Sequence, residues 1–253
     1  MSSKKFGPLV LVHGMWGISD MHYILGIDLS RNRDVYIPSL RGHGDSTLTS
    51  KPFGHMTIKD YLEDVCRVLE WIPGMAEHDR FKNISIIGHS MGGLLALKAS
   101  SVYPLRHVTL INSAPPRGIV LYGISSLFLP KYLWRILRRK QFKLSTFDRR
   151  LLLGNSSYGH EDSDGISYYA SDYESGQAAL DVLLGGMSVD IDEESLPRSL
   201  QVISGMQDRM IHPSIQKKIA SRYGATSYVR IETMSHMIDN STECFWEVER
   251  FHS

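Results

Sequence analysis

Gly88-His89-Ser90-Met91-Gly92 is the stretch of this chain that decides its fold. The apolar run Ile84-Ser85-Ile86-Ile87 precedes it, and the segment 93–99 (GLLALKA) follows it. This order predicts a buried strand, a sharp turn and a helix, which is the setting of a G-x-S-x-G nucleophile elbow. A serine on so tight a turn is strained, and small neighbours such as Gly88, Gly92 and Gly93 let the helix start hard against the strand. Ser90 is therefore a candidate nucleophile.

The partners of this serine decide how much the short motif means. An elbow serine needs a downstream acid after a strand, and then a histidine. The segment 199–204 reads as a strand that runs into a turn ending at Asp208, and 227–231 reads as a strand followed by His236. We therefore predict that Asp208 orients His236 and that His236 acts as the general base.

Other carboxylates and histidines compete for these roles. None of the alternative acids follows a strand and a turn-forming glycine as Asp208 does; these are Asp190, Asp192 and Asp239. The turn after the predicted strand 107–111 holds Asn112-Ser113 and offers no carboxylate. His212 directly precedes Pro213 at a predicted helix start, which favours a helix cap over a base. The remaining competitors belong to the elbow or to structural turns; these are His89, His13 and His43.

A second turn near the N-terminus completes the set. The apolar run 8–12 ends at His13-Gly14-Met15-Trp16. The amide of Met15 would be one donor to a developing oxyanion, and the amide of Met91, at the start of the elbow helix, would be the other. Trp16 is a candidate for lining the acyl pocket, and an ordinary core position is the alternative.

With these motifs in place, the chain resembles the α/β-hydrolase superfamily, and in particular its esterase and lysophospholipase-like (monoacylglycerol-lipase-like) members. The resemblance covers nearly the whole chain and follows the family's order of motifs: His13-Gly14, 38–46 (PSLRGHGDS), the elbow, 205–213 and His236. It implies an α/β-hydrolase fold, with a mostly parallel sheet flanked by helices and a helical cap insertion. Family members often begin with an antiparallel hairpin, which we expect to be missing here because only seven residues precede Pro8.

The order of predicted elements gives the architecture in more detail. Strand-like runs alternate with helical ones and predict about six parallel strands. A helix is expected from Thr57 to Trp71, with Thr57 and Asp60 as a capping box. The alternation breaks down between Pro115 and Leu196. We therefore expect a hydrolase core at 1–114 and 197–253, and a cap at 115–196.

Charges are segregated within the expected cap. The segment 117–150 holds one acid, Asp148, among many basic residues: Arg117, Lys131, Arg135, Arg138, Arg139, Lys140, Lys143, Arg149 and Arg150. The segment 161–194 is acidic and holds no Lys or Arg. A helix is expected at 130–140, with an apolar side of Leu129, Tyr132, Leu133, Ile136 and Leu137. Either the two halves face each other or solvent, or the basic half meets anionic lipid or an anionic acyl carrier.

Composition excludes several classes of protein. A hydrophobic fraction of 42%, a charged fraction of 22% and a net charge of +1 are typical of a globular protein and argue against a general nucleic-acid binder. No run approaches the length of a membrane span, and residues 1–7 lack the apolar core of a signal peptide, so we expect a cytoplasmic protein. Cys66 and Cys244 lack metal-ligand spacing and are expected to be free thiols. We expect neither a cofactor nor a metal.

The expected activity is that of a serine hydrolase that cleaves a carboxylic ester with a small to medium apolar acyl group. Ser90 at the elbow argues against haloalkane dehalogenases and epoxide hydrolases, whose elbow residue is Asp. Hydrolysis of a carrier- or coenzyme-linked thioester is the nearest alternative, and carbon–carbon bond hydrolysis and peptide release also occur on this triad. A ligand receptor or interaction protein on the same scaffold is the alternative outside enzymes. The sequence leaves the oligomeric state open.

Overall fold

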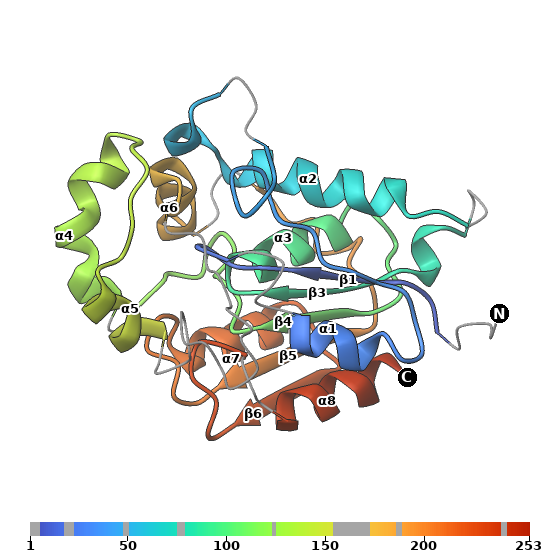
Figure 1. Cartoon of the computed structure of the whole chain (residues 1–253). Coiled ribbons are helices and arrows are strands. Elements are labelled where there is room, and N and C mark those ends of the chain that lie inside the picture. The colour runs from blue at the N-terminus through green and yellow to red at the C-terminus, as the bar shows by residue number, and fades with distance from the viewer. Residues whose placement is uncertain are drawn as a thin grey trace, which may run out of the picture.

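The computed structural model has a six-stranded sheet at its centre, with the strand order β2-β1-β3-β4-β5-β6 (Figure 1). It describes residues 6–17, 23–47, 51–74, 79–122, 125–153, 173–185, 189–238 and 242–253. The strands are β1 (Leu9–Val12), β2 (Val35–Tyr36), β3 (Ser85–His89), β4 (Val108–Ile111), β5 (Leu200–Gly205) and β6 (Ser227–Ile231). Every neighbouring pair is parallel, which confirms the predicted sheet of six parallel strands.

The four central strands are buried along their whole length, because helices cover both faces of the sheet. On one face, α2 (Ile58–Trp71), α3 (Met91–Ser100) and α7 (Pro213–Arg222) share a core with alternate strand residues such as Val10 and Ile86. On the other face, α1 (Tyr23–Leu29) and α8 (Thr242–His252) pack on the intervening residues such as Leu11 and Ile87. Figure 1 shows α2 above the strands and α8 along the lower side of the molecule.

The helix that follows the β2 region begins where the sequence predicts. Thr57 is the N-cap of α2, and its side chain accepts a hydrogen bond from the Asp60 amide. The Asp60 carboxylate in turn accepts from the Thr57 amide at 2.7 Å, which completes the capping box. Two short 3-10 helices, Phe53–His55 and Phe81–Asn83, flank α2 along the chain.

The turn between β3 and α3 is strained at its serine. Ser90 has φ 55° and ψ −121°, a conformation that a side chain with a Cβ rarely adopts. The glycine pattern explains how the chain tolerates it: a Cβ on Gly92 would lie 2.2 Å from the Val12 carbonyl oxygen. The first turn of α3 therefore lies directly against the end of β1, and the serine is held where the two strands end.

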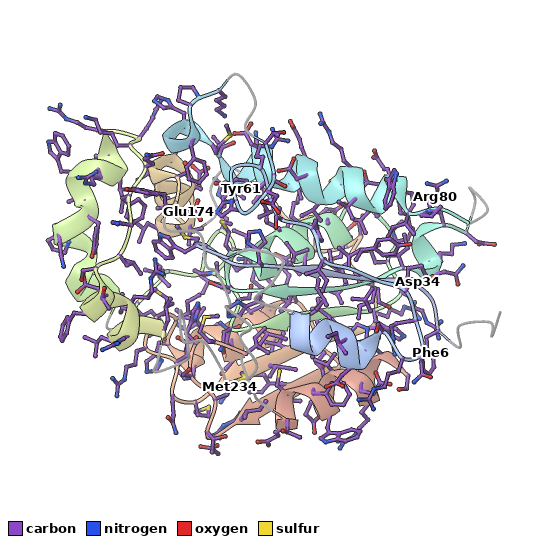
Figure 2. The ribbon with its side chains drawn as sticks, in the orientation of Figure 1. Phe6, Asp34, Tyr61, Arg80, Glu174 and Met234 are labelled. Carbon is purple, nitrogen blue, oxygen red and sulfur yellow. The ribbon has the colours of Figure 1, made fainter. Side chains whose placement is uncertain are left out.

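Three helices of the expected cap lie beyond the ends of the strands: α4 (Ser125–Leu137), α5 (Thr146–Leu153) and α6 (Gly176–Leu183). Figure 1 shows α4 and α5 at the edge of the molecule, and Figure 2 places Glu174 close to Tyr61 of α2, at the junction of cap and core. The only strand-like pairing described in this segment is the bridge between Phe142 and Glu174.

The structure corrects the helix that the sequence placed at 130–140. The helix α4 spans Ser125–Leu137 and has Pro130 inside it. A proline favours the first turn of a helix, and the prediction therefore began the helix there. Tyr132 and Ile136 are buried as expected, but Leu133 and Leu137 are exposed and do not belong to the buried side. The side chain of Leu129 lies outside the described residues.

Both cysteines are free thiols, as predicted. Within the described ranges, Arg117 and Asp190 form an ion pair at 2.9 Å that joins the basic and acidic halves of the cap. A second pair, Lys131 with Asp148, lies within the basic half. None of the helices that the structure describes is both long and apolar enough to cross a membrane.

Candidate active site

The three side chains predicted to act together lie in one hydrogen-bonded chain. His236 Nε2 is 3.0 Å from Ser90 Oγ, and His236 Nδ1 is 2.8 Å from Asp208 Oδ2. All three residues are buried. An ionised carboxylate can only accept, so His236 Nδ1 carries the proton that faces Asp208, which leaves Nε2 able to accept the Ser90 hydroxyl proton.

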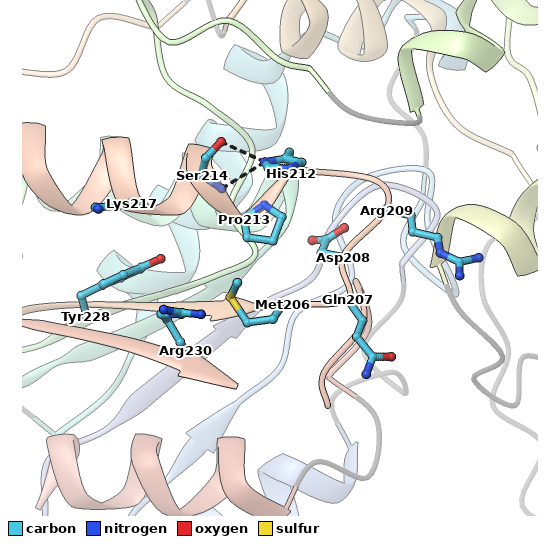
Figure 3. Close-up of a pocket in the computed structure, with 10 residues that line it drawn as sticks. All are labelled: Met206, Gln207, Asp208, Arg209, His212, Pro213, Ser214, Lys217, Tyr228 and Arg230. Carbon is cyan, nitrogen blue, oxygen red and sulfur yellow. Dashed lines mark hydrogen bonds between the residues drawn. The ribbon is translucent and has the colours of Figure 1, made fainter. Parts of the chain in front are cut away.

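The turn after β5 holds Asp208 rigidly. Its second oxygen, Oδ1, accepts hydrogen bonds from the amides of Met210 at 2.8 Å and Ile211 at 2.9 Å. Figure 3 shows Asp208 on this turn, just before His212 and Pro213 at the start of α7. His212 accepts a hydrogen bond from the Ser214 amide, which confirms it as a helix cap. One carboxylate oxygen thus fixes the turn and the other orients the imidazole.

The same turn borders an open surface groove on its outer side (Figure 3). Basic side chains line much of this groove; they are Arg209, Lys217 and Arg230, together with His212. Arg230 is paired with Glu232 at 3.0 Å. The groove does not contain Ser90 or His236, so the serine opens onto a different cavity.

The backbone of His236 is clamped by two side chains that the sequence did not single out for this role. Asn112 Nδ2 donates to the carbonyls of Ser235 at 2.8 Å and His236 at 3.0 Å. Asn112 Oδ1 accepts from the Gly205 amide at 2.7 Å, which ties the His236 loop to the end of β5. His89 Nε2 also donates to the His236 carbonyl, at 2.7 Å. Asn112 stands at a position where the sequence offers no carboxylate. It joins the loop of Asp208 to the loop of His236.

The competing acids lie elsewhere. Asp190 is exposed and paired with Arg117, and Asp192 is exposed and accepts from Ser195 at 2.6 Å. Asp239 lies outside the described residues. Of the weighed acids that the structure describes, Asp208 is therefore the one that contacts His236.

The loop of the candidate oxyanion donors packs directly on the serine. A Cβ on Gly14 would lie 2.6 Å from Ser90 Cβ, so only a glycine lets this loop come so close. Met15 follows Gly14, and Met91 follows Ser90. Neither amide has a hydrogen-bond acceptor among the residues that the structure describes. Two donors without an acceptor beside a buried hydroxyl are suited to bind a developing negative charge.

An apolar cavity of about 100 Å³ lies at the serine. Ser90, His236, Met15, Met91 and Trp16 line its core end. The segment expected to form the cap contributes a rim of apolar side chains: Leu121, Tyr132, Ile136, Phe142, Leu144, Leu152, Leu153, Ala179, Val182 and Leu183. The remaining lining residues come from the core; they are His89, Ala114, Met210, Ile211 and Met237. Trp16 thus both lines the cavity and packs edge-on against Phe142, with ring centroids 5.5 Å apart.

A buried histidine–carboxylate pair lies behind the loop that holds Gly14 and Met15. His43 Nε2 is 3.1 Å from Glu174 Oε2, and both side chains are fully buried. Burial acts to lower the pKa of His43, but the attraction and hydrogen bond of Glu174 outweigh it and hold this pKa above its usual value. Burial likewise acts to raise the pKa of Glu174, but the attraction and hydrogen bond of His43, together with the hydrogen bonds from the Ser175 and Trp16 amides, outweigh it and hold this pKa below its usual value. Sequence reasoning placed His43 in a structural turn and had no signal for Glu174.

Asn112→Ala tests the clamp on the His236 loop. We expect the reaction of Ser90 with a fluorophosphonate, a reagent that phosphonylates serines activated by an imidazole, to slow by about tenfold or more, because small displacements of a base cost that much. The measurement is the second-order labelling rate. Thr109→Val is the matched control, because it removes buried hydrogen bonds from the same strand β4 but far from Ser90. Equal labelling rates in Asn112→Ala and the wild type would contradict the role.

Comparisons with known proteins identify the fold family. Residues 7–238 match the family model for the alpha/beta hydrolase fold. The structure of a lipase-esterase related protein from Clostridium acetobutylicum has a TM-score of 0.69 at 17% identity, covering 96% of this chain and 93% of that one. A monoacylglycerol lipase from Paleococcus ferrophilus has a TM-score of 0.67 at 19% identity, covering 97% and 93%. These structures show a shared fold.

Among curated proteins, protein phosphatase methylesterase 1 of Candida albicans is 30% identical over 104 residues, which is 40% of this chain and 27% of that protein. The curated relatives are matched over only 27% to 35% of their own length. The family model, by contrast, spans most of the chain from the His13-Gly14 loop to His236. On that match and on its six-stranded parallel sheet, the chain belongs to the α/β-hydrolase fold family.

Proposed function

We propose that this protein hydrolyses carboxylic esters of small to medium apolar acyl groups through an acyl-serine intermediate. The observation that carries the proposal is the hydrogen-bonded chain from Asp208 through His236 to Ser90, which ends at an apolar cavity. The esterase and lipase names among the structural relatives agree with this assignment. The proposal includes the division of the chain into a core, 1–114 and 197–253, and a cap, 115–196.

Ser90 is the nucleophile in this mechanism. His236 Nε2 takes the hydroxyl proton while Ser90 Oγ forms a bond to the ester carbonyl carbon. The tetrahedral intermediate collapses, and the protonated His236 gives its proton to the departing alcohol oxygen. Water then attacks the acyl-serine in the same way and releases the acid and the free serine. Asp208 keeps the imidazole in the productive tautomer and stabilises its charged form in both halves.

The Met15 and Met91 amides bind the negative oxygen in both tetrahedral intermediates. Each such donor is worth on the order of a hundredfold in rate. Because the donors are backbone groups, the two methionine side chains are free to shape the acyl cavity, and their flexible thioethers adapt to different chains. Trp16 gives the cavity a rigid aromatic wall on the core side.

Turnover of matched esters and thioesters of rising acyl length tests the proposal. We expect short and medium esters to be hydrolysed, with a length optimum set by the small volume of the apolar cavity. Ser90→Ala should remove nearly all turnover, because the nucleophile is lost, and should leave the unfolding temperature close to that of the wild type.

The same panel distinguishes the alternatives. Faster thioester turnover would assign a thioesterase on the same three residues. A well-folded wild type that turns over neither series, and whose stability changes when a ligand binds, would favour a receptor on this scaffold. Full function in Ser90→Ala would contradict the serine mechanism itself.

The outer face of α4 suggests where a lipid substrate would be met. Trp134 and Leu137 are 54% and 58% exposed. Arg138 lies 4.6 Å and Lys140 5.1 Å from the centre of the Trp134 ring. With Arg139, these cations make no ion pair among the residues that the structure describes. Exposed apolar side chains among unpaired cations are typical of surfaces that bind anionic membranes. We therefore include contact of the cap with an anionic lipid surface in the proposal.

Sedimentation with vesicles of anionic or neutral phospholipid tests this contact. Arg138→Glu with Arg139→Glu should weaken binding to anionic vesicles by about tenfold or more, because each basic residue near the surface contributes about 1 kcal/mol. The control is Lys59→Glu with Arg67→Glu, the same change of charge on the exposed face of α2. Anionic-vesicle binding that both variants keep, or that high salt leaves unchanged, would remove the lipid contact from the proposal.

A further inference from the structure

Glu174 is a fully buried carboxylate that the cap inserts into the core. It lies just before α6, and Figure 2 places it next to Tyr61 of α2. Removing a carboxylate from water is costly unless its oxygens are hydrogen-bonded. The hydrogen-bond donors around this side chain therefore show which groups its burial holds in place.

Four donors surround the two oxygens of Glu174. Oε2 accepts from the Trp16 amide at 3.1 Å and lies 3.1 Å from His43 Nε2. Oε1 accepts from the Tyr61 hydroxyl at 2.9 Å and from the Ser175 amide at 2.7 Å. An ionised carboxylate is a pure acceptor, so it satisfies all four. A glutamine would direct its own N–H groups at one of the two donor pairs.

His43 is the charged partner in this cluster. Its Nε2 faces the carboxylate, and its Nδ1 lies 3.3 Å from the Arg41 carbonyl oxygen. Both ring nitrogens thus face acceptors, which is the environment of a doubly protonated imidazole. The ring is enclosed by the rings of His13, Phe53 and Tyr61, with centroids 5.1 to 5.5 Å away. A charged hydrogen bond in such a place is strong and fixes the orientation of the carboxylate.

The Trp16 amide connects this cluster to residues 13–17, the loop that carries the Met15 amide and is here called the oxyanion loop. Trp16 has a positive φ of 56°, so the backbone just after Met15 is strained. On the other side of Met15, His13 Nδ1 lies 2.8 Å from the Gly14 carbonyl oxygen, and the Gly17 amide donates to that oxygen at 3.1 Å. The backbone is thus held on both sides of the Met15 amide. The Gly14 carbonyl is bonded within the loop, and the Trp16 amide is bonded to Glu174.

We propose that Glu174 is a positioning residue for the oxyanion hole, which holds the Trp16 amide so that the neighbouring Met15 amide points at the reacting carbonyl. The inference rests on the proposed function of Ser90, since the hole has no role without it. The loop belongs to the core and the carboxylate to the cap. Docking of the cap at this point therefore completes the site, beyond covering the acyl cavity.

A neighbouring contact provides the control for this test. Ser175 also fastens the cap to the core, because its hydroxyl contacts the carbonyl oxygens of Gly54 at 3.0 Å and Met56 at 2.7 Å. It caps α6 as well, by accepting from the Ala178 amide. None of these contacts touches the oxyanion loop. Ser175→Ala therefore weakens cap docking and stability while leaving the Trp16 contact in place.

The experiment compares Glu174→Gln with Ser175→Ala in the full chain. For Glu174→Gln we expect kcat on the best ester to fall about 10- to 100-fold, with KM within about threefold, because a misplaced oxyanion donor affects the transition state more than ground-state binding. Labelling of Ser90 by a fluorophosphonate should slow in parallel. Ser175→Ala should lower the unfolding temperature and keep both rates. The assignment is overturned if Glu174→Gln keeps kcat, or loses no more than Ser175→Ala.

A second pair of variants covers a Glu174→Gln protein that does not fold. Both leave the carboxylate in place: His43→Gln disturbs the oxygen that holds Trp16, whereas Tyr61→Phe disturbs the other oxygen. We expect about tenfold slower labelling in the first and an unchanged rate in the second. Equal rates in the two overturn the assignment. A wild type that neither turns over esters nor reacts with the fluorophosphonate removes the proposed function. Normal wild-type reaction with an unaffected Glu174→Gln removes only the positioning role.

Discussion

The backbone of Ser90 carries a positive φ that costs on the order of 1–3 kcal/mol, and the rest of the site depends on how the sheet holds it there. The Ser90 amide donates to the Ile111 carbonyl at 3.0 Å, and its own carbonyl accepts from the Ala114 amide at 2.8 Å. Both partners belong to β4 or the turn that follows it. The neighbouring strand thus locks the strained turn, and the hydroxyl faces the edge of the sheet where all the parallel strands end.

Because the parallel strands end at one edge of the sheet, side chains from several of them can form one hydrogen-bonded chain there. Segments far apart in the sequence supply the proposed nucleophile, acid and base, and Asn112 joins the loops of the last two through three hydrogen bonds. Apolar side chains of the proposed cap line the cavity, and such a lining strengthens the electrostatic contacts inside it. Glu174 extends the same arrangement from the cap into the core. By this account the cap contributes a buried carboxylate to the site as well as apolar side chains.

The parts of this architecture that local patterns encode could be predicted from the sequence. The apolar runs gave the strands to within about a residue, Thr57 and Asp60 gave the start of α2, and the glycines around Ser90 gave the elbow. The predicted start of α4 was wrong because Pro130 lies inside the helix, whereas proline is most common in a first turn. The contact of Glu174 with Trp16 and the clamp made by Asn112 could not be predicted, because Trp16 lies 158 residues from Glu174 and the partners of the Asn112 side chain lie 93 or more residues away.

Covalent labelling tests the central claim, that Ser90 is the nucleophile, most directly. An aryl carbamate transfers its carbamoyl group to an activated serine, and this group is removed from the serine only slowly. The carbamoylated protein and its peptides can therefore be detected by mass spectrometry. The account predicts one carbamoyl group per chain, on Ser90, with activity lost in proportion. A protein that is inactivated with the group on another residue, or that hydrolyses esters while Ser90 stays unmodified, would contradict it.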